Sequence, residues 1–237
     1  MADLPPYPGT PRWVKIFGVI ALVVVLLFVF LMFTRVPVAT ALVATYRPMT
    51  PVAYTARKTR RATAMIMPLR LRKLVYTAHV TTTVGWLGAV LVFLALAVVG
   101  LTSQDAQTVR GAYLVMEPAA WFVLVPLAFA SLLTGIVQSL GTEWGLFRHY
   151  WVLFKLLITI FATIVLLIYM GTFSYMAGVA ADPGADLSVM RNPSPRLHAA
   201  LALVVLLVAT VLAVYKPRGM TRYGWRKQHE RRTMSQP

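Results

Sequence analysis

The chain has 237 residues, of which 59% are hydrophobic and 13% charged, with a mean hydropathy of +0.71. This composition is too apolar for a soluble domain and predicts a membrane protein. Cysteine is absent, which excludes disulfides, thiolate metal sites and cysteine nucleophiles. The net charge of +16 comes from Lys and Arg gathered beside apolar segments. We therefore expect a bilayer with anionic headgroups as the partner, and no nucleic acid.

The first apolar segment covers residues 13–34 and follows a Pro-rich start. Its core, residues 16–33, is longer than the apolar region of a usual signal peptide, so we expect a retained transmembrane helix in residues 1–34. Residues 35–73 are rich in Arg and Thr and contain no Asp or Glu. They predict a basic, irregular linker whose charges set the topology and attract acidic lipid.

Four further apolar segments follow at residues 74–101, 112–140, 150–179 and 197–215. Each is long enough to cross a hydrocarbon core about 30 Å thick as a helix. Their connections are short, so neighbouring helices should run antiparallel. The sequence predicts an all-α transmembrane protein in which residues 74–215 form an antiparallel four-helix bundle, with one extra N-terminal helix and a basic tail at 216–237.

Lys and Arg are most frequent in the 35–73 linker, the 141–149 turn and the tail. The positive-inside rule places these segments in the cytoplasm. We expect a multi-pass protein of the bacterial inner (plasma) membrane, with a cytoplasmic C-terminus and an external N-terminus.

Small residues recur at helix-packing intervals in two spans, in the series Thr81, Gly85, Ala89 and the series Ser131, Gly135, Ser139. Such series let helices approach closely, within the bundle or in a dimer, and the oligomeric state stays open. Pro118 and Pro126 should bend the third of the five spans. We predict packing roles for Gly85, Trp86, Gly88, Ser131 and Gly135, although Trp86 could also line a cofactor pocket.

Ionisable side chains inside apolar spans are costly and are therefore candidates for function. Counting along the helices places His79 ~9 Å beyond Lys73 and Lys155 ~10 Å beyond Arg148. Both counts start from the same side of the membrane, so these two groups should share one layer. The four candidates for binding a ligand, an ion or a proton are His79, Glu117, Lys155 and His198.

Glu117 and His198 should form a second layer, on the other side of the membrane. Glu117 lies ~10 Å inside the edge marked by Arg110, and His198 lies ~3 Å past Arg196. Their side chains could meet and, with loop carboxylates, bind a metal ion. The loop carboxylates above this layer are Asp182 and Asp186.

Structural roles compete with these interpretations. Lys155 can snorkel to the interface, and His149 and His198 can be ordinary interfacial residues. His79 and Glu117 lie deep enough to need a hydrogen-bond partner. Haem b ligated by His79, with His149 as a possible second ligand, is an alternative. His79 and His198 should lie near opposite faces, so they cannot bind the same iron.

No catalytic motif is recognisable, and with so few acidic groups hydrolysis is not expected. We expect a non-enzymatic protein, without a cofactor, that binds or conducts a proton, a metal ion or an apolar ligand around His79, Glu117 and Lys155. A haem-binding redox protein using His79 and a structural or scaffold subunit are the alternatives.

Two stretches carry a resemblance to known proteins. Residues 71–100 include His79 and the run Gly85-Trp86-Leu87-Gly88, and residues 141–153 read GTEWGLFRHYWVL before Lys155. Over about residues 70–215 the chain resembles uncharacterised bacterial integral membrane proteins with a four-span core. This resemblance implies the fold and no activity. His79 and the Gly-Trp-x-Gly motif are more distantly similar to copper-resistance D-type membrane proteins and to some haem-binding four-helix membrane bundles.

Residues 1–34 separately resemble a small single-span bacterial membrane protein. A Gly- and His-rich segment usually follows that span, whereas an Arg- and Thr-rich stretch follows here. One hypothesis is that two adjacent reading frames are joined in this chain. The intact mass of the natively expressed protein tests it, because a product beginning near Met65 or Met67 would show that the five-span chain is not made.

Overall fold

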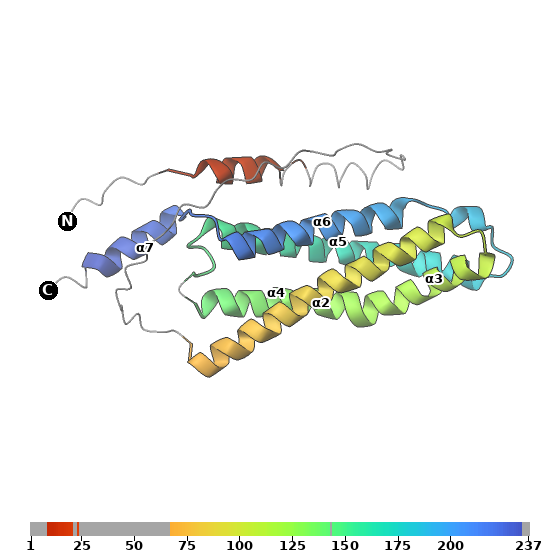
Figure 1. Cartoon of the computed structure of the whole chain (residues 1–237), viewed down its shortest axis with the longest axis horizontal. Coiled ribbons are helices and arrows are strands. Elements are labelled where there is room, and N and C mark those ends of the chain that lie inside the picture. Colours follow the sequence, from red (N-terminus) through yellow and green to blue (C-terminus); the bar gives the residue numbers. More distant parts are fainter. Residues whose placement is uncertain (1–8, 21–22, 24–66, 143, 234–237) are drawn as a thin grey trace.

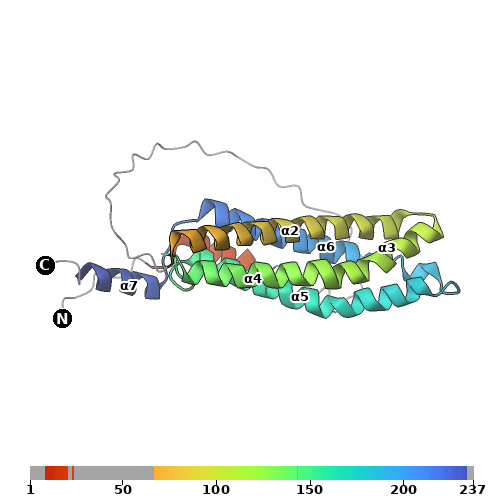
Figure 2. The ribbon, with the colours of Figure 1, turned by 90° about the horizontal axis from the view of Figure 1, so that it is seen from below.

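The computed structural model describes residues 9–20, 23, 67–142 and 144–233, which are almost entirely helical and contain no strand (Figure 1). Four stretches are long and apolar enough to cross a membrane: Leu69–Thr102, Ala106–Leu140, Tyr150–Ala181 and Ser194–Tyr215. They run antiparallel in one elongated bundle (Figures 1 and 2). The prediction of an all-α, multi-pass membrane protein with four core spans is confirmed.

The spans correspond to α2 (Leu69–Thr102), α3 (Ala106–Ala119) continued by α4 (Val125–Leu140), α5 (Tyr150–Ala181) and α6 (Ser194–Tyr215). Helix α6 is followed by a basic helix, α7 (Arg222–Thr233), in the segment for which the sequence predicts only a basic tail. Residues 12–20 are helical too, and Trp13 packs its ring against Tyr150 and Phe154. Most of the expected N-terminal span, and residues 35–66 of the linker, lie outside the described residues.

Three helices, α2, α3 and α6, begin earlier than the hydropathy pattern predicts, and α6 does so by three residues, at Ser194. Helix α2 starts at Leu69, so residues 69–73 of the predicted irregular linker are helical. Its basic residues there are exposed and can reach polar surroundings while the helix continues. Helix α3 starts at Ala106 because the Asp105 carboxylate accepts hydrogen bonds from the backbone N–H groups of Gln107 and Thr108.

The two prolines of the second described span flank an irregularity. Pro118 lies inside α3 and Pro126 in the first turn of α4, and between them residues Ala120–Leu124 form a π-helical segment. A proline inside a helix lacks an N–H donor and clashes with the preceding turn, and a wider turn is one way to relieve this. The span therefore continues without a break in its path (Figure 2).

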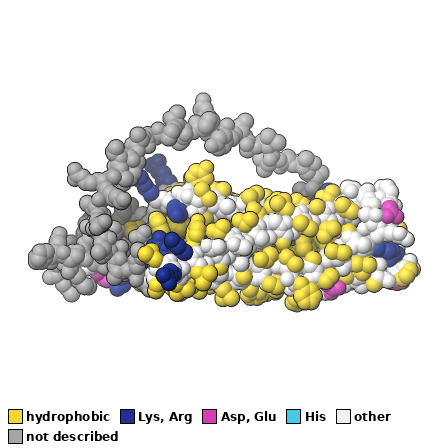
Figure 3. Space-filling view, turned by 60° about the horizontal axis from the view of Figure 1, so that its bottom comes forward, with side chains coloured by type: hydrophobic (Ala, Val, Ile, Leu, Met, Phe, Trp, Pro, Cys, Tyr) yellow, Lys and Arg dark blue, Asp and Glu magenta, His cyan; other side chains and the backbone are white. Residues whose placement is uncertain are grey.

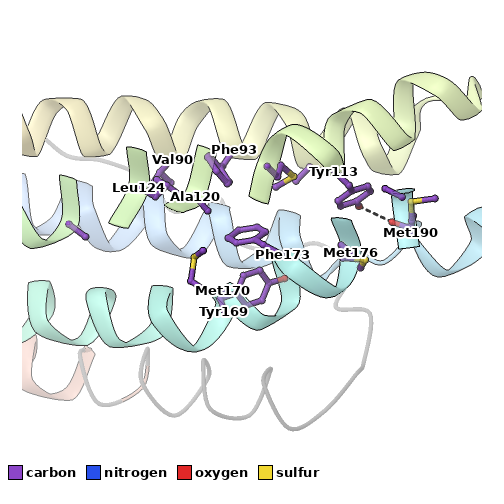
Figure 4. Packing of buried hydrophobic residues seen from close by; sticks show 14 of the residues in the cluster. Val90, Phe93, Tyr113, Ala120, Leu124, Tyr169, Met170, Phe173, Met176 and Met190 are labelled. Carbon is purple, nitrogen blue, oxygen red and sulfur yellow. Dashed lines mark hydrogen bonds between the residues drawn. The ribbon is translucent and has the colours of Figure 1, made fainter. Parts of the chain in front are cut away.

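The two ends of the bundle differ. The basic end holds the start of α2, the α4–α5 turn, the end of α6, and α7, and Lys and Arg side chains gather there on the face drawn in Figure 3. The opposite end holds the α2–α3 and α5–α6 loops. The hydrophobic core extends from the middle of the bundle towards the opposite end, where Phe173 contacts Phe93 and Tyr169 edge to face (Figure 4).

At the opposite end, hydrogen bonds to backbone carbonyls connect α3 to the end of α5 and to the α5–α6 loop. The Arg110 guanidinium donates to the carbonyls of Val179, Ala180, Asp182, Pro183 and Ala185, where α5 ends. The last carbonyls of a helix have no N–H partner in a following turn, and a guanidinium group can supply donors there. Nearby, the buried Tyr113 hydroxyl donates to the Met190 carbonyl at 2.7 Å (Figure 4).

Helices α2 and α4 approach closely through the predicted glycines. A Cβ atom added at Gly85 would lie 3.3 Å from the Leu127 side chain, and one added at Gly135 would lie 3.1 Å from the His79 ring. A Cβ atom added at Gly88 would meet no described atom within 4 Å. Trp86 and Ser131 are both buried between the helices. The packing is thus within one chain, as one of the two interpretations of the small-residue series expected.

Candidate functional site

His79 and Lys155 meet inside the bundle near the basic end. Lys155 Nζ lies 2.9 Å from His79 Nε2, which joins α5 to α2. The His79 side chain is buried, and the Lys155 side chain is half-buried. The predicted shared layer of these two groups is therefore present as a direct hydrogen bond.

A threonine on α4 determines the tautomer of His79. Thr134 Oγ1 donates to the Ala130 carbonyl at 2.6 Å and lies 3.0 Å from His79 Nδ1. Because the single hydroxyl hydrogen goes to Ala130, the hydroxyl accepts from Nδ1–H. The other ring nitrogen of His79, Nε2, then carries the lone pair and accepts from Lys155. The imidazole thus holds the lysine nitrogen in place.

A glycine on α4 makes room for this arrangement. Gly135 lies one residue after Thr134, and a Cβ atom there would come within 3.1 Å of His79 Cε1. The ring can therefore lie against the α4 backbone while its Nδ1 reaches the Thr134 hydroxyl.

Lys155 lines a cavity of about 480 Å³, which we call the polar cavity. This volume is within the roughly 300–1,000 Å³ typical of small-molecule sites. All four spans contribute to its wall. Hydroxyl, amide and ammonium side chains line it on both sides of the His79–Lys155 pair, and these are Thr83, Ser131, Gln138, Ser139, Thr142, Thr159, Thr210 and Lys216.

Two polar atoms in this wall lack a hydrogen-bond partner among the described residues. They are Oε1 of Gln138 and Nε1 of Trp151, and both atoms are inaccessible to solvent. The Trp151 side chain is 8% exposed, and its ring packs against Trp144, which also lines the cavity. Buried polar atoms nearly always have partners, so these two atoms are exceptions in the part of the chain that the structure describes.

No described carboxylate lies within ion-pair distance of Lys155. In the part of the chain that the structure describes, one ion pair is formed, between Lys227 and Glu230 of α7. Asp105, Asp182 and Asp186 lie in the loops of the opposite end. An ammonium group has three N–H donors, and His79 takes one of those of Lys155.

A second, smaller cavity of about 80 Å³ lies towards the opposite end, and we call it the apolar cavity. Its wall consists of aromatic and aliphatic side chains with Tyr169 and His198, whose rings stack at 4.3 Å. Trp86 and Leu206 line both cavities. These two apolar side chains therefore separate them.

The structure does not bring Glu117 and His198 together. His198 Nδ1 lies 2.8 Å from the Ser194 carbonyl, and the ring stacks on Tyr169. Glu117 is half-buried, and it does not line the apolar cavity that His198 lines. A position on the same side of the membrane does not ensure that two side chains point to a common interior.

The other groups proposed for a metal site lie apart as well. The Asp182 and Asp186 carboxylates accept hydrogen bonds from nearby backbone N–H groups in their own loop. Bonds from the Ser188 N–H and hydroxyl groups hold the pKa of Asp186 below its usual value. Among the described residues, no three His, Asp or Glu side chains are close enough to bind one metal ion.

His149 lies in the turn at the basic end, where its Nδ1 is 2.8 Å from the Trp144 carbonyl. Its backbone also pairs with Met220. His79 Nε2, the usual atom for ligating haem iron, already accepts from Lys155. Haem ligation by His79 and His149 stays a prediction that no contact in the structure supports.

Sequence reasoning missed the cavity wall around the pair. Trp144 and Trp151 are typical interfacial aromatic residues by position, and Gln138 lies at the end of a span. The available signal was the helical spacing of Trp151 and Lys155, four residues apart, which places both on one face of α5.

The residues that carry the resemblance are thus partly those of the polar cavity, which His79, Trp86, Trp144 and Lys155 all line. The relation to four-span bacterial membrane proteins, and the more distant one to copper-resistance D-type proteins, stays a prediction. Searches of protein-family models, of curated proteins and of solved structures found no match for the chain.

Proposed function

We propose that this membrane protein binds a small anionic molecule in the polar cavity, with Lys155 as its charged contact. The observation that carries the proposal is a lysine nitrogen oriented by His79 on a cavity wall, without a described carboxylate beside it. A charge within an apolar bundle needs a counter-charge, and a bound anion supplies one.

Further polar groups favour binding at this place. The hydroxyl group of Thr142 lines the cavity and can donate a hydrogen bond to an anion. Lys216 lines the same cavity near the basic end, with its Nζ 5.4 Å from the centre of the Trp144 ring. We place the basic end in the cytoplasm of a bacterium, because basic segments are retained on that side of the inner membrane.

Binding is favoured over conduction by the contents of the bundle. Beyond Lys155 and His79, the interior is closed by Trp86 and Leu206, and the apolar cavity follows. These walls offer a proton or an ion few polar groups to bind along the way.

The experiment measures binding of acetate, phosphate and octanoate to the purified protein in a neutral detergent by isothermal titration calorimetry. We expect at least one anion to bind, and Lys155→Met to weaken its binding at least about tenfold, the factor that corresponds to 1.4 kcal/mol. Lys73→Met is the matched control, because Lys73 is exposed near the same end of the bundle and does not line the cavity. Equal binding by Lys155→Met, or no binding of any of the three anions, would overturn the proposal.

A further inference from the structure

The polar cavity has an apolar rim formed by α2 and α6. On α2 the rim includes Val80 and Val84, which are 40% and 63% exposed. On α6 it includes Ala213 and Val214, and Val214 is 70% exposed. Within a membrane, side chains exposed on this rim contact lipid chains rather than water.

The course of α2 explains this rim. Figure 1 shows α2 crossing the bundle obliquely, with its start well apart from the end of α6 and its end beside α6. The two helices diverge towards the basic end (Figure 1), where α2 begins, and His79 belongs to the first half of α2. Because Val80 and Val84 of α2 and Val214 of α6 are exposed and line the polar cavity, this cavity faces the bilayer between α2 and α6, in the leaflet on the side of the basic end.

The wall changes character along the bundle axis. Around and below Lys155 it is formed by hydrogen-bonding groups such as Gln138, Trp151 and Lys216. Beyond Lys155, towards the middle of the membrane, the largest side chains of the wall are apolar, namely Trp86, Leu87 and Leu206, and the hydroxyl groups of Thr83, Ser131 and Thr159 belong to this part as well. The charged and amide groups thus lie on the headgroup side, and the large apolar side chains lie on the side of the lipid chains.

We infer that the bound anion is a single-chain amphiphile with an anionic headgroup, of the fatty-acid type, which enters from the leaflet between α2 and α6. The inference rests on the proposed function and specifies its ligand. The headgroup contacts Lys155, and the chain lies along Val84 and Leu206. Lys216 at the polar end of the cavity attracts the same charge.

A water-soluble anion explains less of this geometry. It would need the polar part of the cavity alone, and it would leave the apolar rim and the gap between the helices without a role. A neutral lipid would fill the apolar part and leave Lys155 without a counter-charge. A chain that carries one negative charge matches both parts of the wall.

Bromine atoms on a lipid chain quench tryptophan fluorescence on contact, and Trp86, Trp144 and Trp151 line the cavity. The experiment titrates the full chain, in nanodiscs of zwitterionic lipid, with 9,10-dibromostearate and with the corresponding brominated alcohol. We expect dibromostearate to quench with at least about tenfold higher affinity than octanoate binds, because burying more CH₂ groups stabilises the complex. The alcohol should bind at least tenfold more weakly than dibromostearate.

Two variants narrow the gap from its two sides. Ala213→Phe on α6 and Val84→Trp on α2 should each weaken dibromostearate binding about tenfold and leave acetate or phosphate binding unchanged. Val211→Phe is the control, because Val211 is 48% exposed on α6 and does not line the cavity. Using two rim variants keeps the test valid if one of them fails to fold.

The outcomes separate this inference from the proposed function. If an anion binds through Lys155, but neither the length of its chain nor the two rim variants change the binding affinity, the inference of an amphiphile is overturned and the proposal of anion binding stands. If the brominated alcohol binds as well as the acid, the cavity does not recognise charge and both proposals fail. If Ala213→Phe and Val84→Trp instead convert a dimer to a monomer in light scattering, a second copy of the chain fills the gap and the amphiphile is overturned.

Discussion

The two halves of the bundle are built from the same helices but differ in the size of their cavities and in the pairing of their buried polar groups. Towards the opposite end, the cavity is small, about 80 Å³, and the Arg110, Tyr113 and Tyr169 side chains each donate to or pair with a described group. Towards the basic end, the helices enclose a cavity of about 480 Å³, and two buried polar atoms in its wall have no described partner.

This difference shows where the sequence departs from optimal stability. Cavities and unsatisfied polar groups both reduce the free energy of unfolding, and proteins retain them at sites that bind something. On the proposed function, the opposite end is the scaffold and the basic end is the binding site. We expect substitutions that damage packing at the opposite end to have large effects on stability. We expect substitutions at the basic end to affect binding.

The largest effect is expected at the boundary between the halves. Trp86→Ala should lower the free energy of unfolding by about 3–5 kcal/mol, because it removes a buried ring and joins the two cavities. Reversible unfolding in mixed detergent micelles measures it. Trp121→Ala is the control, since Trp121 is 50% exposed and its loss should cost far less. Equal costs for the two variants would contradict the separation of the cavities.

The next effect concerns the end of α5. Arg110→Ala should cost about 2–3 kcal/mol, because hydrogen bonds from a charged group to several backbone carbonyls are lost together. Arg110→Lys should recover part of this at most, since a lysine lacks the planar fork. Both variants should leave anion binding in the polar cavity unchanged. A loss of binding would show that the halves are not independent.

A smaller effect is expected from one hydroxyl group. Tyr113→Phe should cost about 1–2 kcal/mol, because the buried Met190 carbonyl loses its donor. Tyr175→Phe serves as the control on a lipid-facing position, where the side chain is 61% exposed. Thermal unfolding followed by circular dichroism compares the two, and no difference between them would argue against a buried hydrogen bond.

The smallest effect is a pH dependence at the start of α3, outside the membrane. Hydrogen bonds from the Thr108 hydroxyl and from the N–H groups of Thr108 and Gln107 hold the pKa of Asp105 below its usual value. The cap therefore stabilises the helix above the ordinary Asp pKa of about 3.9 and is lost as the pH falls through the lowered value. The difference in Tm between the wild type and Asp105→Ala should shrink in that range. A constant difference down to the lowest pH tested would show that the charge does not matter.

Much of the fold follows from periodicity and length alone. Apolar length identified the four spans, and the rise per residue placed His79 and Lys155 at one depth, where they form a hydrogen bond. Depth does not specify direction around a helix axis, and Glu117 and His198 accordingly do not meet. The unpartnered atoms of Gln138 and Trp151 depend on the packing of all four spans, which hydropathy does not describe.

Helix α6 is followed by Lys216, whose backbone is in the left-handed conformation. Lys216 has a φ of 42°, in the left-handed region that glycine adopts most easily. Glycine at this position would relieve about 1–2 kcal/mol of backbone strain, but it would also remove the ammonium group beside Trp144 at the polar end of the cavity. On the proposed function, a more stable helix end and anion binding make opposite demands on this one position. We therefore expect the Lys216→Gly variant to have a higher free energy of unfolding and a lower affinity for the anion than the wild type.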